Sequence, residues 1–107
     1  MKQDKVFSLL GLAMKAGKIV SGEFSTEKAI KTGAACYVVI AEDASDNTKK
    51  AFFDSCSYYQ VPFSVYGTKE MLGHCIGKER RASLAVLDAG FGQKIAELIE
   101  RQNHMEV

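Results

Sequence analysis

Residues 36–41 read Cys-Tyr-Val-Val-Ile-Ala, and this run carries most of the information on the fold. Its β-branched and aromatic residues favour a strand, and polar residues do not alternate with the apolar ones. A strand without such alternation is typical of a sheet covered on both faces. The longest apolar run, residues 34–41, is far shorter than the roughly 20 residues that a membrane-spanning helix needs. The run therefore predicts a buried central strand in an α/β protein.

Two helices and a short extended segment are expected before this strand. Hydrophobic residues recur with a helical period over Val6–Met14. Lys18–Val20 is short and extended in character. The turn at Ser21–Gly22 then opens a second helix, expected from Glu23 to about Thr32.

Helices and strands also alternate after the central strand. The expected elements are a helix over 46–59, a strand over 61–66, a short helix over 69–76, a strand over 83–87 and a helix beginning near Phe91. One side of the first of these helices is expected to carry Ala51, Phe52, Ser55, Cys56 and Tyr59. Alternation with short connections predicts an α/β fold, a three-layer α-β-α sandwich.

The composition is that of a soluble globular protein. The chain has 107 residues, of which 47% are apolar and 25% charged, enough for one domain with its own core. The three cysteines are widely spaced and odd in number, which fits reduced thiols in the cytoplasm. No C-x-x-C pair and no signal-peptide pattern is present. We expect a single domain over residues 1–107, with no metal or other cofactor.

Charge is distributed unevenly, although the net charge is only +1. Residues 1–31 carry six lysines and three acidic residues, and residues 60–87 carry four basic and two acidic residues. Both remaining stretches, 42–59 and 88–107, have a net negative charge. If the two positive stretches meet in space, they form a basic face suited to a polyanion.

Recognisable catalytic machinery is lacking. The chain has only two histidines, in no spacing that supplies a general base with an orienting partner and a nucleophile, and it has no glycine-rich phosphate loop. Glu42–Asp43 follow the central strand, where α/β proteins often place a site. The alternative is a solvated turn next to a helix cap. We expect a protein without enzymatic activity and keep a small enzyme or ligand binder at Glu42–Asp43 as a minor hypothesis.

Two segments have the chemistry to bind nucleic acid. Gly22 lies at an expected helix N-terminus, where free N–H groups and the helix dipole favour phosphates or base edges. Lys28 and Lys31 follow three residues apart on one helix face. The loop Lys78-Glu-Arg-Arg81 adds arginines, which contact phosphates and guanine edges. For each segment the alternative is an ordinary charged surface.

The order of segments resembles a known family. The residues that carry the resemblance are Gly22-Glu-Phe-Ser-Thr-Glu-Lys28-Ala-Ile-Lys-Thr-Gly33, Val38-Val-Ile-Ala-Glu-Asp43, Val61-Pro-Phe63, Thr68-Lys-Glu-Met-Leu-Gly73 and Ile76-Gly-Lys78. They are similar to the kink-turn-binding family of archaeal and eukaryotic large-subunit ribosomal proteins, and to its bacterial YlxQ-type branch. The resemblance spans about Val6 to Ile99. It implies a four-stranded mixed sheet in which Lys18–Val20 is the fourth strand.

The resemblance also implies two RNA contacts, at the start of the second helix and in the loop before the last strand. The family pattern at the helix is Gly-x-Asn-Glu, followed three residues later by Lys. Gly22 and Lys28 match this pattern, whereas Phe24 stands where Asn is usual and Ser25 where Glu is usual. In the family these two positions contact the sheared G·A pairs of a kink-turn. The substitutions therefore leave kink-turn specificity open.

We expect a cytoplasmic, monomeric protein that binds structured RNA such as rRNA, with the ribosome as a partner, and that does not bind a membrane. The candidate RNA-binding residues are Lys18, Gly22, Glu23, Phe24, Ser25, Lys28, Lys31, Lys78, Arg80 and Arg81. The alternative is a protein–protein adaptor with the same fold and no specific RNA affinity.

Overall fold

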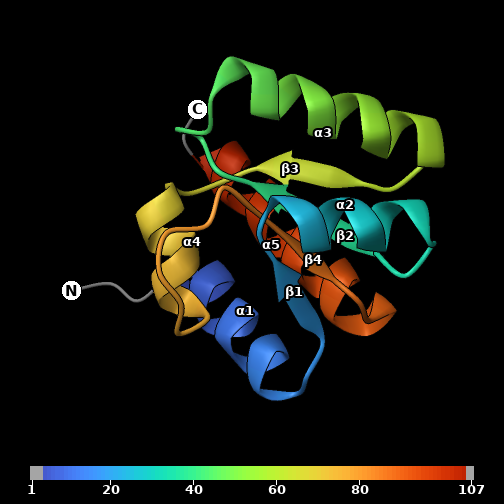
Figure 1. Cartoon of the computed structure of the whole chain (residues 1–107). Helices are drawn as coiled ribbons and strands as arrows, with labels where there is room; N and C mark the ends of the chain where they lie inside the picture. Colours follow the sequence, from blue (N-terminus) through green and yellow to red (C-terminus); the bar gives the residue numbers. More distant parts are fainter. Residues whose placement is uncertain (1–3, 106–107) are drawn as a thin grey trace.

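The computed structural model describes residues 4–105, and helices and strands alternate along them (Figure 1). In chain order they are α1 (Lys5–Lys15), β1 (Ile19–Ser21), α2 (Glu23–Lys31), β2 (Tyr37–Ile40), α3 (Asp46–Tyr59), β3 (Phe63–Val65), α4 (Lys69–Cys75), β4 (Ser83–Val86) and α5 (Ala89–Met105). All the expected elements are present. The fourth strand begins at Ile19, one residue later than expected.

The four strands form one mixed sheet in the order β1-β4-β2-β3. The strand β4 runs antiparallel to both β1 and β2, whereas β2 and β3 are parallel. Ser21 is paired with Leu84, so the end of β1 lies beside the beginning of β4. This pairing brings the residues after β1 close to those before β4, although 60 positions separate Ser21 from Arg81.

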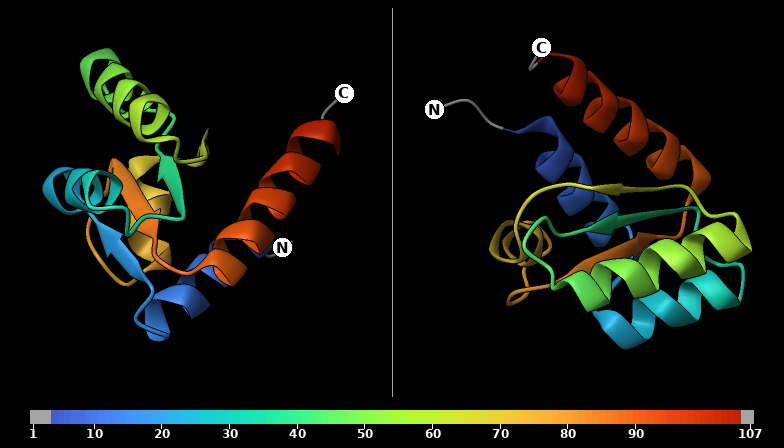
Figure 2. Two further views of the ribbon diagram at one scale, coloured as in Figure 1. Left: turned by 90° about the vertical axis from the view of Figure 1, so that its right-hand side faces the viewer. Right: turned by 90° about the horizontal axis from the view of Figure 1, so that it is seen from above.

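Helices cover both faces of the sheet, as the three-layer prediction requires. Figure 2 shows α2 and α3 on one side of the strands and α1 and α5 on the other. The helix α4 packs beside α1 at one end of the sheet (Figure 1). None of the helices in the described part of the chain is long and apolar enough to cross a membrane.

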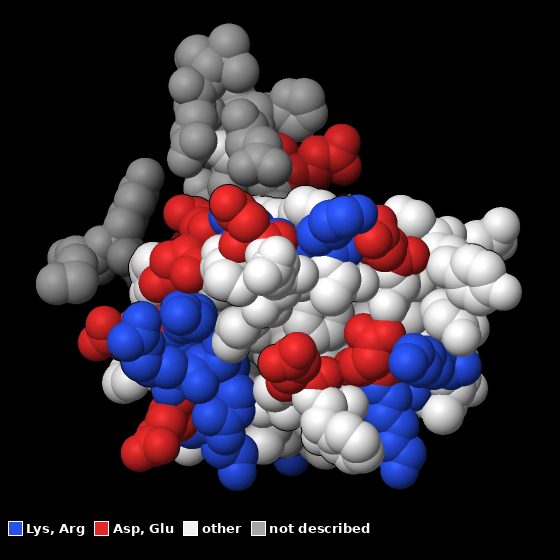
Figure 3. Space-filling model, turned by 45° about the horizontal axis from the view of Figure 1, so that its top comes forward, with Lys and Arg blue, Asp and Glu red and all other residues white. Residues whose placement is uncertain are grey.

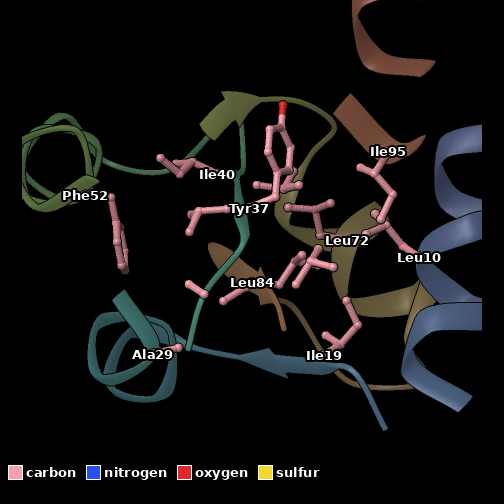
Figure 4. Packing of buried hydrophobic residues seen from close by; sticks show 14 of the residues in the cluster. Leu10, Ile19, Ala29, Tyr37, Ile40, Phe52, Leu72, Leu84 and Ile95 are labelled. Atoms are coloured by element: carbon pink, nitrogen blue, oxygen red, sulfur yellow. The ribbon is translucent and has the colours of Figure 1, made fainter. Parts of the chain in front are cut away.

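Burial on both faces explains why polar and apolar residues do not alternate along the central strands. All four residues of β2 and all four of β4 are buried. Figure 4 shows the core around Tyr37 and Leu84, with Phe52 reaching in from α3 and Ile95 from α5. The fold class predicted from residues 36–41 is thus confirmed.

The predicted buried side of α3 is only partly correct. Phe52 and Cys56 are buried, but Ala51 is exposed and Tyr59 is 41% exposed. Tyr58 also has a core-like spacing, yet it is 80% exposed and packs edge-on against Tyr59. The helix buries only a narrow stripe against α2 and β2, so the side chains of its last turn extend beyond the packed layer.

Candidate nucleic-acid interface

The N-terminus of α2 is not capped by a side chain. Gly22 is its N-cap residue and has φ 92° and ψ 162°, a conformation that strains residues with a Cβ atom. Its N–H donates to the Ser83 carbonyl over 3.0 Å, and its carbonyl accepts from the Thr26 N–H. By contrast, the N-cap residues of α1, α3 and α4 are Asp4, Ser45 and Thr68, and their side chains accept backbone N–H groups of the first helical turn.

This difference leaves donors available at the start of α2. Glu23, Phe24 and Ser25 occupy the first helical turn, where backbone N–H groups have no partner within the helix. No acceptor for these three N–H groups is found among the described residues. The helix therefore presents three unpaired donors and its positive dipole end at the surface.

The loop before β4, residues 77–82, is seated directly on α4. The Lys78 N–H donates to the Gly73 carbonyl over 2.9 Å, and the Arg81 N–H donates to the Lys69 carbonyl over 3.0 Å. A Cβ atom on Gly73 would lie 1.8 Å from the carbonyl oxygen of Glu79. Only glycine permits this close approach, so α4 fixes the position of the loop.

Arg81 joins this loop to the start of α2. Its Nε donates to the Ser21 hydroxyl over 3.1 Å, one residue before Gly22. Its Nη1 donates to the carbonyls of Glu79 and Arg80, which holds the guanidinium against its own loop. The two segments proposed from the sequence therefore meet. Arg80 is more exposed, with Nη2 at 3.9 Å from Asp43.

Phe24 and Lys28 lie on the outer face of α2. Phe24 is 80% exposed, an unusual setting for a large apolar side chain. Lys28 is exposed and has no ion pair among the described residues. Together with Ser25 they line an open depression of about 330 Å³, whose floor includes Val20 and Leu87.

Two predicted lysines fit the basic face less well. Lys31 lies 3.7 Å from Glu27, so part of its charge is compensated. The carbonyl of Lys18 accepts from the N–H of Leu87, which follows β4, so Lys18 lies at the opposite end of β1 from Gly22. Figure 3 shows basic side chains in separate groups on this face, with acidic and uncharged residues between them. The expected continuous patch is therefore interrupted.

The acidic pair after β2 has a structural role. A Glu42 carboxylate oxygen accepts from the Gly67 N–H over 3.1 Å, and Asp43 Oδ1 accepts from the Lys69 N–H over 2.8 Å. Lys69 is the first residue of α4. The two carboxylates thus tie the β2–α3 turn to the start of α4, which supports the reading as a turn and cap.

Two of the three thiols, those of the buried Cys56 and the partly buried Cys75, have low reactivity. Burial raises the pKa of Cys56 to about 11, with a further contribution from the charge of Glu27, and burial also raises the pKa of Cys75 to about 11. A thiol of such high pKa is almost wholly protonated at neutral pH and is a poor nucleophile or metal ligand. Among the residues described, no three His, Cys, Asp or Glu side chains gather into a possible metal site.

Sequence reasoning missed two residues that build this surface. From the sequence Ser21 is only part of a turn, and its contact with Arg81 depends on strand pairing that the sequence does not reveal. Gly73 is there only one of the residues that carry the resemblance. A glycine within a seven-residue helix is a signal in itself, because it disfavours the helix unless close packing requires it.

Comparison with known proteins identifies the family of this chain. Residues 4–96 match the family described as "Ribosomal protein L7Ae/L30e/S12e/Gadd45 family". The "RNA-binding protein YlxQ" of Bacillus subtilis (strain 168) is 46% identical over 94 residues, which cover 88% of this chain and 94% of that protein. A protein of the same description from Enterococcus faecium is 43% identical over 99 residues, which cover 92% of this chain and 94% of that protein.

Solved structures match over similar lengths. A protein of unknown function from Bacillus halodurans is 43% identical, with a TM-score of 0.89, and the match covers 92% of this chain and 99% of that one. A 15.5 kD RNA binding protein of Giardia lamblia has a TM-score of 0.75 at 20% identity, covering 94% and 90%, and this likeness concerns the fold alone.

Proposed function

The chain belongs to the ribosomal protein L7Ae/L30e/S12e/Gadd45 family, and from this premise we propose that it is a single-domain protein that binds structured RNA. The family is non-enzymatic, and the relative that is 46% identical is described as an RNA-binding protein. The observation that carries the proposal is the hydrogen bond from Arg81 to Ser21, which joins the basic loop to the uncapped start of α2.

The proposed contacts follow from the groups available on this surface. The unpaired N–H groups of Glu23, Phe24 and Ser25 donate to a phosphate or to base edges at the start of α2. Lys78 and Arg80, both exposed, add positive charge from the loop side. An RNA bend or internal loop can bring its backbone and its bases to both elements at once, whereas a regular duplex hides its base edges in a deep, narrow groove.

Phe24 and Ser25 favour a particular mode of recognition. Phe24 has no hydrogen-bonding side-chain atom, but its exposed ring can stack on an unpaired base, a contact worth about 1–3 kcal/mol. Lys28, one helical turn farther along, is available for a phosphate of the same strand. We therefore propose a bent or internal-loop RNA with an accessible base, such as a site in rRNA. A kink-turn remains within this class of target.

The test is fluorescence anisotropy with a labelled kink-turn RNA, with its G·A pairs either intact or disrupted, at two salt concentrations. We expect binding that weakens with salt, because phosphate contacts release counterions. The variants Lys28→Ala and Arg80→Ala should each weaken binding and reduce the salt slope by about 0.7–0.9. The matched control is Lys50→Ala, which removes an exposed, ion-paired lysine from α3. Equal effects of all three variants would contradict the proposed surface.

A protein–protein adaptor is the second candidate function, and the exposure of Phe24 favours it as much as it favours RNA stacking. The two functions differ in what Phe24→Ala does. If the surface binds RNA, the substitution weakens RNA binding several-fold without loss of stability. If the protein is only an adaptor, wild-type protein does not bind either RNA, and Lys28→Ala and Arg80→Ala have no effect to show.

A further inference from the structure

An apolar groove lies between α1 and α5, on the layer opposite to α2. It has a volume of about 460 Å³. Its floor is formed by Leu9 and Leu12 of α1 and by Leu98 of α5. Leu9 and Leu98 are partly buried against the core, whereas Leu12 is 56% exposed. The groove is thus an apolar surface that nothing in the described part of the chain covers.

The rim of the groove is basic. Lys5 on α1 and Lys94 and Arg101 on α5 line it, and no acidic side chain of the described residues does. Lys94 is partly compensated by Glu97, 3.9 Å away, whereas Lys5 and Arg101 have no ion pair among the described residues. The groove therefore combines a leucine floor with a net positive border.

Its dimensions match two turns of a helix. Lys5 and Leu12 are seven residues apart, as are Lys94 and Arg101, so each wall is about 10 Å long at 1.5 Å per residue. A helix that lies in such a groove anchors itself with side chains at positions i, i+3 or i+4, and i+7. Residues flanking these anchors would face the basic rim.

We propose that the α1–α5 groove binds a short acidic amphipathic helix of a partner protein. Charge complementarity selects this occupant. The leucines of the groove need apolar anchors, and the cations of the rim, Lys5 and Arg101 above all, attract carboxylates. A second copy of the chain, docked through the same groove, would bring like charges together.

The groove is independent of the proposed RNA surface. The sheet separates α1 and α5 from α2 (Figure 2), so RNA and a protein helix can bind at the same time. The protein would then connect a structured RNA to an acidic partner. This inference does not rest on the identity of the RNA.

The probe is a pool of N-acetylated peptides of about 14 residues, with Leu, Ile, Phe or Met at the three anchor positions and Glu or Asp elsewhere. Binding is measured by anisotropy, and the site is mapped by ¹H–¹⁵N chemical-shift changes on full-length protein. We expect micromolar to submillimolar binding, with shifts concentrated in residues 5–12 and 94–101. Peptides of the same pattern with Lys in place of Glu should bind at least about tenfold more weakly.

Two variants test the floor and the rim separately. Leu12→Gln, at an exposed position, should weaken binding about tenfold. The double variant Lys5→Glu/Arg101→Glu should reverse the preference, so that it binds the Lys peptides better than the acidic ones at low salt. The charge-matched control is the double variant Lys49→Glu/Lys50→Glu on α3, which should have no effect.

The proposal is overturned if no acidic peptide binds below about 1 mM, if the shifts lie outside the groove, or if the charge reversal leaves the preference unchanged. Binding through Leu12 to phosphatidylglycerol vesicles, without peptide binding, would identify a membrane surface instead. All groove variants should keep wild-type affinity for the kink-turn RNA. If neither the wild type nor any variant binds RNA, the proposed function is contradicted, and the peptide measurements still decide the inference on the groove.

Discussion

Replacing Gly73 with alanine should displace the basic loop and weaken RNA binding through a change that adds no charge. In the structure a Cβ atom at this position would lie 1.8 Å from the carbonyl oxygen and 2.5 Å from the carbonyl carbon of Glu79. Ordinary contacts need about 3.5 Å, so the loop backbone would have to move by about 1.5 Å. A backbone atom cannot rotate away as a flexible side chain can.

The cost can be estimated from opposing effects. Alanine improves helix propensity by about 1 kcal/mol over glycine. Movement of the loop breaks or weakens two hydrogen bonds, Lys78 N–H to Gly73 and Arg81 N–H to Lys69, each worth about 1 kcal/mol. Residual overpacking costs about 1–3 kcal/mol. The net loss is about 2–4 kcal/mol, or roughly 8–30 °C in Tm for a domain of this size.

The assay combines thermal unfolding by circular dichroism with RNA anisotropy on the same samples. The matched control is Gly90→Ala, a helical glycine whose nearest neighbour is a side-chain atom, the Asp88 carboxylate oxygen at 3.2 Å, which also accepts the Phe91 N–H. It should change Tm little and leave RNA binding intact. If Gly73→Ala were as stable as wild type, or lost stability without losing RNA affinity, the argument that α4 positions the loop for binding would be refuted.

Two further predictions concern stability. Asp4→Ala should lower the free energy of unfolding in urea by about 1–2 kcal/mol. Asp4 caps α1 by accepting the Val6 N–H at 2.8 Å, and it accepts the Tyr66 hydroxyl at 2.6 Å. A loss below about 0.5 kcal/mol would contradict this role. Burial raises the pKa of Cys56 and of Cys75 from 9 to about 11. Between about pH 9 and 11 the unfolded chain therefore loses its thiol protons while the folded chain keeps them, so the free energy of unfolding should fall as the pH rises. The double variant with alanine at both positions should show a smaller pH slope, and an unchanged slope would exclude the thiols as its source.

The sequence predicted the fold well because its signals are local. Helical periodicity over Val6–Met14 and the unbroken apolar run at 36–41 both reflect which faces are covered. The exposure of Tyr58 and Tyr59 could not be predicted, because spacing gives the side of a helix but not how far the neighbouring layer extends. Packing of α3 on α2 decides that limit.

The candidate site was predicted as segments rather than as a surface. The sequence marks the start of α2 and the loop at 78–81 as candidate segments without showing that they meet. The contact that joins them, Arg81 to Ser21, depends on β1–β4 pairing. Charge counting also treated Lys31 as free, although Glu27 lies one turn away and 3.7 Å distant. Such compensation depends on side-chain geometry as well as on sequence spacing.

The measurement that tests the central proposal most directly is a ¹H–¹⁵N titration of the protein with the kink-turn RNA. We expect the largest chemical-shift changes at residues 78–81 and at the amides of Glu23, Phe24 and Ser25. The N–H groups of these three residues have no partner in the described part of the chain. Shifts confined to other surfaces, or saturation of the RNA without change at these amides, would contradict it.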